Sequence, residues 1–183
     1  MFIKQLSFEK VDLTQIRKDM NAILDLEGWG YENQLGLTYR PNAENKWKDS
    51  TGSLYDRERK VELIKETDFT EFNEDTPDYL KTVVKDFAKF QGIEIGRARL
   101  MRLEPKKGLT VHHDNSVRYH LVVTSNQHSF ICHTVLPNSN KLTSLCYTLP
   151  ADGFFYTIDT TKEHFVYNGG TTDRIHLVIS PKE

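Results

Sequence analysis

The chain has 183 residues, of which 38% are hydrophobic, a length and composition suited to one globular domain. Its formal net charge of −2 argues against a surface that binds nucleic acid or an anionic membrane. The first residues contain no long apolar run, so we expect neither a secretory signal nor a membrane span.

Two amphipathic helices are predicted in the first half of the chain. Apolar residues recur at helical spacing from Leu13 to Leu24 and stop before Gly28. A second helix is predicted with Thr76 as its N-cap, Pro77 at its first position and Gly92 as its stop. Its apolar face is formed by Leu80, Val83, Val84, Phe87 and Phe90. Both helices should lie against a sheet.

The segment between these helices reads as a strand followed by a loop. Residues 34–40 favour a strand, and residues 41–52 are polar with one aromatic side chain, Trp47. Trp47, Tyr55 and Arg57 in this region are candidate substrate-pocket residues, with surface or packing roles as the alternative.

After Gly92 the apolar pattern shortens to a period of two, and turn signals recur at close intervals. Strands are predicted at 98–103, 117–123, 130–135, 142–149, 154–158 and 175–179, and turns at 105–108, 124–126, 137–140, 150–153 and 168–170. Many short strands favour a mostly β fold, a jelly roll or related barrel, with the helices packed outside. We expect a single domain over 1–183, in which 1–92 form a helical, substrate-side support and 93–183 the barrel core.

The two cysteines, Cys132 and Cys146, are too few for a disulfide framework and make a poor metal site by themselves. A reduced, cytoplasmic setting is therefore expected. Residues 1–95 carry a net charge of −5 and residues 96–183 a net charge of +3. A mildly cationic second half suits a site for acidic small molecules, although a difference of this size also arises by chance.

All seven histidines fall between residues 112 and 176, which indicates a histidine-dependent site in the β-rich part. His128 and His133 are interpreted as ordinary histidines on half-buried strands. In an extended segment residues i and i+2 project to the same face, so His112 and Asp114 can share one metal ion and His113 cannot easily join them.

A third ligand from another strand would complete two imidazoles and one carboxylate on one face of an octahedron. The opposite positions then stay open, as is typical of non-haem Fe(II) oxygenases. A closed zinc site would want a fourth protein ligand. His164 is the best candidate for the distal ligand, and the alternative is that it caps or packs a turn.

Arg174 lies at the start of an otherwise apolar strand, where alternation places it on one face with His176 and Val178. A buried arginine is costly unless its charge is paired, and its planar fork matches a carboxylate. A bound dicarboxylate would satisfy it; the alternative is a strand-mouth arginine paired with Asp173.

Arg118 and His120 share one face of the strand at 117–123. They could bind a second carboxylate, or His120 could be an ordinary core histidine. His176, on the face of Arg174, is assigned to the same co-substrate site.

Together these motifs resemble the aspartyl/asparaginyl β-hydroxylase family of Fe(II)/2-oxoglutarate oxygenases. The resemblance covers residues 97–179 and rests on the segments 99–105, 112–114, 118–121, 158–159, 164–168 and 173–177. It implies a double-stranded β-helix, a jelly-roll or cupin-like barrel, that holds iron through His112, Asp114 and His164. It also implies that Arg174 binds the distal carboxylate of 2-oxoglutarate, with Arg118 and His120 near its iron-chelating end.

The activity that the resemblance implies is hydroxylation of an amino-acid side chain. Fe(II), 2-oxoglutarate and molecular oxygen would be consumed with release of succinate and carbon dioxide. The substrate would be a small molecule or peptide, such as a protein Asp or Asn residue or a free amino acid such as proline, with no nucleic-acid or membrane partner. The alternative is a metal-binding cupin-like protein that does not oxidise: an isomerase, a hydrolase or a ligand-binding module.

Overall fold

The computed structural model describes residues 1–56, 58–59, 61–135 and 143–182. Contacts divide the chain into two compact units. The barrel unit consists of Met1–Lys10 and Arg102–His176, and the helical unit of Val11–Met101 and Leu177–Glu183. The single domain with a boundary near residue 92 stays a prediction.

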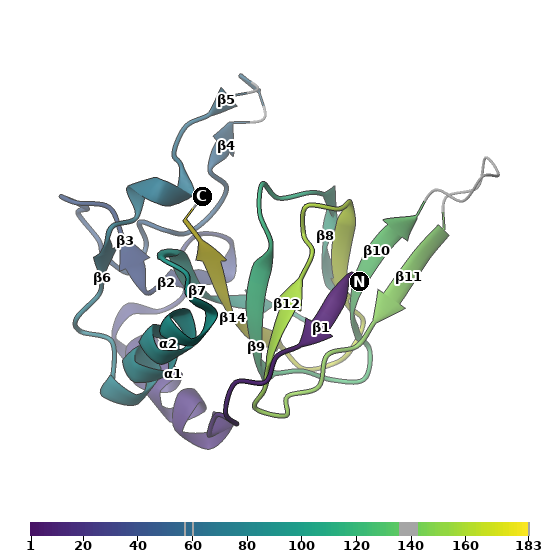
Figure 1. Ribbon diagram of the computed structural model, residues 1–183, viewed down its shortest axis with the longest axis horizontal. Helices are drawn as coiled ribbons and strands as arrows, with labels where there is room; N and C mark the ends of the chain where they lie inside the picture. Colours follow the sequence, from purple (N-terminus) through teal and green to yellow (C-terminus); the bar gives the residue numbers. More distant parts are fainter. Residues whose placement is uncertain (57, 60, 136–142, 183) are drawn as a thin grey trace. The chain divides into compact units, whose positions relative to one another are not determined.

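The first sheet of the barrel unit has the order β1-β12-β9-β14 (Figure 1). Its strands are β1 (Ile3–Gln5), β12 (Phe155–Ile158), β9 (Arg118–Thr124) and the first residues of β14 (Arg174–Pro181). β1 runs antiparallel to β12, with Ile3 opposite Ile158, and β12 runs antiparallel to β9, with Phe155 opposite Leu121. The N-terminal residues are thus a structural strand of this unit.

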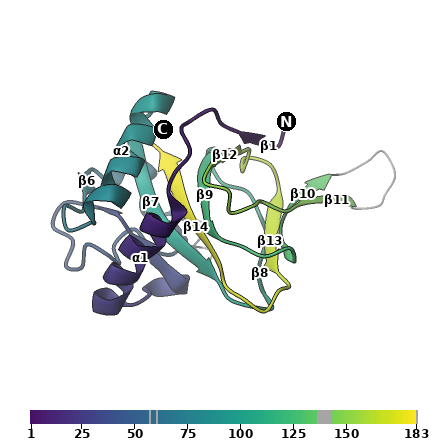
Figure 2. The same ribbon diagram turned by 90° about the horizontal axis from the view of Figure 1, so that it is seen from below.

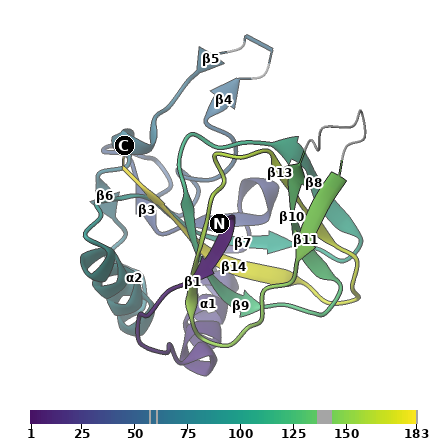
Figure 3. The ribbon, with the colours of Figure 1, turned by 45° about the vertical axis from the view of Figure 1, so that its right-hand side comes forward.

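The second sheet of the barrel unit has the order β11-β10-β13-β8 (Figure 3). Its strands are β11 (Thr143–Tyr147), β10 (Ser129–Val135), β13 (His164–Asn168) and β8 (Lys107–His112). All three neighbouring pairs are antiparallel, and a bulge between His164 and Val166 shifts the register of β13 against β8.

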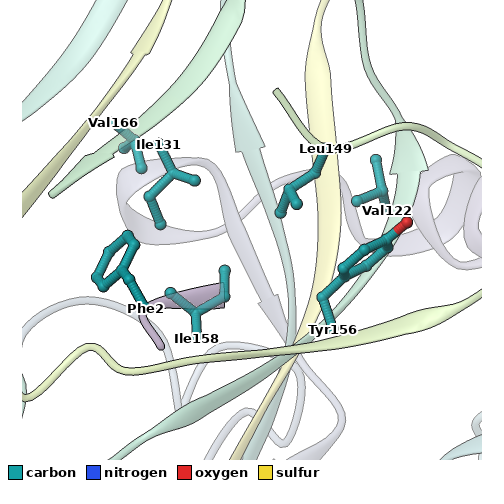
Figure 4. Packing of buried hydrophobic residues seen from close by; sticks show 7 residues of the cluster. All are labelled: Phe2, Val122, Ile131, Leu149, Tyr156, Ile158 and Val166. Atoms are coloured by element: carbon teal, nitrogen blue, oxygen red, sulfur yellow. The ribbon is translucent and has the colours of Figure 1, made fainter. Parts of the chain in front are cut away.

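Side chains from both sheets form one apolar core (Figure 4). Its buried members are Phe2, Val122, Ile131, Leu149, Tyr156, Ile158 and Val166. Ile131 and Val166 are cross-strand partners, so their side chains point to the same face of the second sheet. Two antiparallel sheets that enclose a common core are the arrangement of a jelly roll, which confirms the predicted mostly β barrel.

The helical unit contains two α-helices that lie side by side (Figure 2). Its elements are α1 (Leu13–Glu27), η1 (Tyr31–Asn33), β2 (Gln34–Gly36), β3 (Thr38–Tyr39), β4 (Tyr55–Asp56), β5 (Val61–Glu62), η2 (Glu66–Asp68), β6 (Glu71–Phe72), α2 (Asp78–Gln91) and most of β7 (Ile95–Leu103). β2 pairs with β7, β3 with β6, and β4 with β5, each antiparallel. The strand predicted at 34–40 is thus divided into β2 and β3.

Helix α1 forms as its sequence predicts. The Asp12 carboxylate accepts the backbone N–H groups of Thr14 and Gln15, which satisfies donors that a helix start leaves open. Gly28 ends the helix with φ = 65°, a conformation that favours glycine. The predicted apolar residues Ile16, Met20 and Ile23 are buried.

Helix α2 also forms, but the predicted cap is wrong. Pro77 is the N-cap, and Thr76 Oγ1 is buried without a hydrogen bond to any described residue. The backbone N–H of Leu80, in the first turn of α2, has no acceptor within the helix. It donates instead to the Asp19 carboxylate of α1 at 3.0 Å. Phe90, predicted on the buried face, is 49% exposed.

The strands predicted after Gly92 are all present where the structure describes them, within a few residues of the expected bounds. β1, β8 and β13 were not among the strands predicted from the sequence. β8 is an edge strand whose side chains are mostly exposed, and its two alternating apolar residues, Leu109 and Val111, are too few to identify a strand from the sequence. The turn predicted at 137–140 lies outside the described residues.

The two cysteines differ from the expected pair of free thiols. Cys132 on β10 and Cys146 on β11 are direct cross-strand partners and form a disulfide. The strand register that brings them together is set by the sheet and is not visible in the spacing of the two residues. Neither α1 nor α2 has the length and apolar character of a membrane-spanning helix, and the described part of the chain contains no other candidate.

Replacing Asp19 with Leu should destabilise the protein. The change leaves the Leu80 N–H buried without its acceptor, which costs about 1–3 kcal/mol in the free energy of unfolding. Asp19→Asn keeps an acceptor oxygen and should cost less. Urea unfolding followed by circular dichroism measures both, with exposed Asp25→Leu as the matched control. Equal losses for Asp19→Leu and Asp25→Leu would show that the hydrogen bond is unimportant.

Candidate metal and co-substrate site

Two adjacent strands bring the predicted metal ligands together. His112 ends β8 and His164 begins β13, and the two residues are direct cross-strand partners with ring centroids 4.4 Å apart. Asp114 follows β8 by two residues. One ligand atom from each of the three side chains lies within 4.8 Å of the others. Two imidazoles and one carboxylate suit Fe(II) in an open facial site.

Backbone carbonyl groups orient both imidazoles. His112 Nδ1 lies 2.7 Å from the carbonyl oxygen of Thr110, and His164 Nδ1 lies 2.9 Å from that of Lys162. A carbonyl oxygen only accepts, so each Nδ1 carries the proton and donates it. In the neutral ring the lone pair is then on Nε2, which leaves Nε2 of both rings for a metal.

The loop that carries Asp114 is fixed by hydrogen bonds to the turn before β13. The Asp114 N–H donates to the Thr160 carbonyl oxygen at 2.8 Å, and Thr160 Oγ1 donates to the Ser116 carbonyl oxygen at 2.6 Å. Arg118 Nε lies 3.5 Å from Asp114 Oδ2 and holds one carboxylate oxygen. The same guanidinium also contacts the Ser116 hydroxyl. Arg118 therefore orients the carboxylate in this structure.

The surroundings of His164 favour its neutral form. Burial lowers the pKa of His164 below its ordinary value, and the neighbouring His112 and Arg118 lower it further. The Lys162 carbonyl and Asp114 act in the opposite direction, and the net direction is down. A neutral imidazole is the form that binds a metal, so His164 needs little deprotonation to act as a ligand near neutral pH.

Arg174 is a buried cation. It is 8% exposed, and it makes no hydrogen bond or ion pair with any described residue. Burial lowers its pKa to about 10. The alternative interpretation was an ion pair with Asp173. The structure contains no such pair among the described residues; Asp173 Oδ2 instead lies 3.7 Å from a guanidinium nitrogen of Arg102. The Arg174 guanidinium thus fits a carboxylate ligand.

His176, two residues after Arg174 on β14, forms a buried pair with His120 on β9. Their Nδ1 atoms are 3.1 Å apart, so one ring donates and the other accepts. His176 Nε2 is buried and has no hydrogen-bond partner in the described chain. Burial, Arg174 and His120 all lower the pKa of His176 well below its ordinary value. When both rings are neutral, the pair presents one N–H donor and one lone pair on its Nε2 atoms.

His133 is a residue of this region that the sequence interpretation missed. It is the direct cross-strand partner of His164, on the other side from His112. The sequence places it on a strand but does not give the pairing of that strand, so the alternation pattern alone could not locate it beside a metal ligand. His113 and His128 are exposed.

The three candidate substrate residues belong to the helical unit or lie outside the described residues. Trp47 is buried, and its carbonyl accepts the Gly36 N–H. Tyr55 begins β4 and is 47% exposed. Arg57 lies outside the described residues. Their role in a substrate pocket stays a prediction.

A family model matches almost the whole chain. The model described as aspartyl/asparaginyl beta-hydroxylase matches residues 10–182. No curated protein matches the chain by sequence.

Several solved structures resemble the chain. SnoK, described as a non-heme alpha ketoglutarate dependent carbocyclase from nogalamycin biosynthesis, is 10% identical, with 97% of this chain and 78% of that chain covered and a TM-score of 0.54. An oxidoreductase of the 2OG-Fe(II) oxygenase family from Burkholderia pseudomallei is 15% identical, with 60% and 59% covered and a TM-score of 0.45. A cupin domain from Bordetella pertussis is 18% identical, with 48% and 81% covered and a TM-score of 0.36.

At these identities the similarity concerns the fold alone. The likeness to SnoK extends over nearly the whole chain and agrees with the two-sheet topology described above. The chain spans 59% of the length of the Burkholderia protein.

Replacing His112, Asp114 or His164 with Ala should weaken metal binding. Mutation of a residue that only hydrogen-bonds to a metal ligand typically lowers metal affinity by about tenfold or more. Loss of one of the three ligands themselves should therefore lower the affinity for Fe(II) by at least about tenfold. Anaerobic calorimetry with Fe(II) measures this, and His113→Ala is the matched control because His113 is exposed and adjacent. If His113→Ala weakened Fe(II) binding equally, the assignment of His112, Asp114 and His164 as the metal ligands would be wrong.

Acid should destabilise the metal-free protein through His176. The unfolded chain takes up a proton near the ordinary pKa of 6.5, whereas the folded chain does so only at lower pH. The free energy of unfolding should therefore decrease as the pH falls below about 6.5. Urea unfolding with EDTA across this range should give a smaller decrease for His176→Gln, and an unchanged one for exposed His128→Gln. Parallel pH profiles for wild type and His176→Gln would contradict the account.

Proposed function

The chain belongs to the aspartyl/asparaginyl beta-hydroxylase family, and on this premise we propose that it is an Fe(II)- and 2-oxoglutarate-dependent dioxygenase. Its reaction is hydroxylation of an amino-acid side chain, in a protein or in a free amino acid. Succinate and carbon dioxide are the co-products, and molecular oxygen is the oxidant.

The observation that carries the proposal is Arg174. A buried guanidinium without an acidic partner among the described residues is unfavourable, because no ion pair offsets the free-energy cost of removing its charge from water. 2-Oxoglutarate has a carboxylate at each end, and its distal carboxylate would pair with the two parallel N–H donors of Arg174. The His120–His176 pair, on the same sheet, would supply further hydrogen bonds to the co-substrate.

The metal is assigned to His112, Asp114 and His164. Their donor set leaves open positions for the 2-oxo acid and oxygen, and the described residues supply no fourth ligand to this cluster as a closed zinc site would require. When bound, Fe(II) supplies the activation of oxygen that is coupled to decarboxylation of the 2-oxo acid. The protein residues around the site orient the metal ligands. The carbonyl groups of Thr110 and Lys162 hold the two imidazoles, and Arg118 holds the Asp114 carboxylate.

A metal-binding barrel that does not oxidise is the competing function. Such an isomerase, hydrolase or ligand-binding module needs the three metal ligands but has no use for a buried, unpaired arginine. Arg174 therefore favours the oxygenase.

Replacing Arg174 with Ala should weaken co-substrate binding strongly and leave the metal site intact. Loss of one partner of a buried charged pair costs 2–5 kcal/mol, so the Kd for 2-oxoglutarate should rise at least about 30-fold. Anaerobic titration of the Fe(II) protein, followed by the visible charge-transfer band of the bound 2-oxo acid, measures this.

The control for this variant is Arg102→Ala. Arg102 is also in the barrel unit, but it is partly exposed and lies near Glu104 and Asp173. The Arg102→Ala variant should bind 2-oxoglutarate as the wild type does. If Arg174→Ala lowered Fe(II) and 2-oxoglutarate affinity equally, the role of Arg174 would be structural, and a wild type that binds no 2-oxoglutarate would refute the oxygenase itself.

A further inference from the structure

Three imidazoles form one row across the second sheet of the barrel unit. His133 on β10 is opposite His164 on β13, which is opposite His112 on β8. Direct cross-strand partners have Cβ atoms about 4.5–5.5 Å apart and point to one face. His133 is therefore the first side chain beyond the distal metal ligand, on the side where β10 and β11 lie (Figure 3).

The His133 ring is held by stacking and keeps its nitrogen atoms available. It lies on the Phe2 ring with centroids 4.6 Å apart and an interplanar angle of 15°. Phe2 is also 6.5 Å from the His164 ring, so it links the two imidazoles. His133 is half-buried, and neither ring nitrogen makes a hydrogen bond with a described residue. Its position is fixed while its polar atoms remain open to a ligand.

The inward side of β10 and β11 carries no Asp, Glu, Lys or Arg side chain. Register places six side chains on it: Ile131, His133, Val135, Thr143, Leu145 and Tyr147. We call this surface the β10–β11 face. Leu145 is 50% exposed and Tyr147 is 36% exposed, and the Tyr147 ring lies 5.9 Å from that of Phe2. Exposed apolar side chains beside a reactive centre, with few polar groups among them, are typical of a ligand-binding surface.

The cations of the site lie on the other sheet. Arg118 is on β9 and Arg174 on β14, both in the first sheet of the barrel unit. Carboxylates are therefore favoured on that side, whereas an acidic side chain on the β10–β11 face would meet no cation of that face.

From these observations we infer that the β10–β11 face binds the primary substrate and selects an apolar amino-acid side chain, with His133 as the polar contact. The inference rests on the proposed function, because it assigns the substrate side of the same metal site. Leu145 and Tyr147 supply apolar contact area, and a His133 nitrogen hydrogen-bonds to a carbonyl or carboxylate oxygen of the substrate main chain.

Binding can be tested without turnover. The protein is loaded with Zn(II), which does not change its oxidation state, and titrated calorimetrically with and without 2-oxoglutarate. The probes are the free amino acids and the N-acetyl amides of Leu, Pro, Asp and Asn. The Leu or Pro probes should bind at least about tenfold more tightly than those of Asp and Asn.

The variants separate the two parts of the β10–β11 face. His133→Phe keeps the aromatic stack on Phe2 but removes the hydrogen bond, and should weaken apolar-probe binding about tenfold. His133→Gln retains a polar atom and should recover part of the loss. Leu145→Asp places a charge on the face and should weaken apolar probes at least about tenfold. The 2-oxoglutarate Kd should change in none of them.

Two exposed residues outside the face serve as controls. His128→Ala and Tyr167→Ala change an exposed histidine and an exposed aromatic residue, and both should bind the probes as the wild type does. Thermal unfolding confirms that each variant is folded.

Several outcomes would overturn the inference. These are preferred binding of Asp or Asn probes, no binding of any probe at millimolar concentration, or unchanged apolar-probe binding in both His133→Phe and Leu145→Asp. A His133→Phe variant that loses 2-oxoglutarate instead would assign His133 to the co-substrate. If wild type bound no 2-oxoglutarate, the oxygenase proposal would fail, while the titrations without it would still decide whether the face selects apolar side chains.

Discussion

The antiparallel pairing of β13 with β8 is the constraint on which the site depends. It sets His164 opposite His112, although 51 residues separate them in the chain. The hydrogen bond from the Asp114 N–H to the Thr160 carbonyl oxygen then brings the carboxylate to the same place. Because sheet pairing is cooperative, three ligands are held by many backbone hydrogen bonds that do not involve the ligands themselves.

The site separates charge between its two sheets. Arg174 and Arg118 belong to the first sheet of the barrel unit, and the β10–β11 face, which has no Asp, Glu, Lys or Arg, belongs to the second. Under the proposed function, an acidic co-substrate and an apolar substrate would therefore be recognised by different walls around one metal. The same barrel core supports both walls, since its apolar residues come from both sheets.

The sequence was sufficient where local geometry decides. Alternation selected His112 and Asp114 over His113, and it identified Arg174 as an unusual residue in an apolar strand. It was insufficient where pairing across the chain decides. His133 was interpreted as ordinary because nothing in its own strand shows that His164 lies opposite. The predicted N-cap of α2 was wrong for the same reason, because the acceptor for the Leu80 N–H is Asp19 on another helix.

The pairing of His120 with His176 through Nδ1 atoms has a chemical consequence of its own. A single proton is shared along that bond, and whichever ring holds it must present a bare Nε2, while the other presents N–H. Transfer of the proton, with a compensating change at the outer nitrogens, reverses the two roles without altering the net charge. Two neutral imidazoles joined in this way can therefore match a ligand group that donates a hydrogen bond as well as one that accepts it.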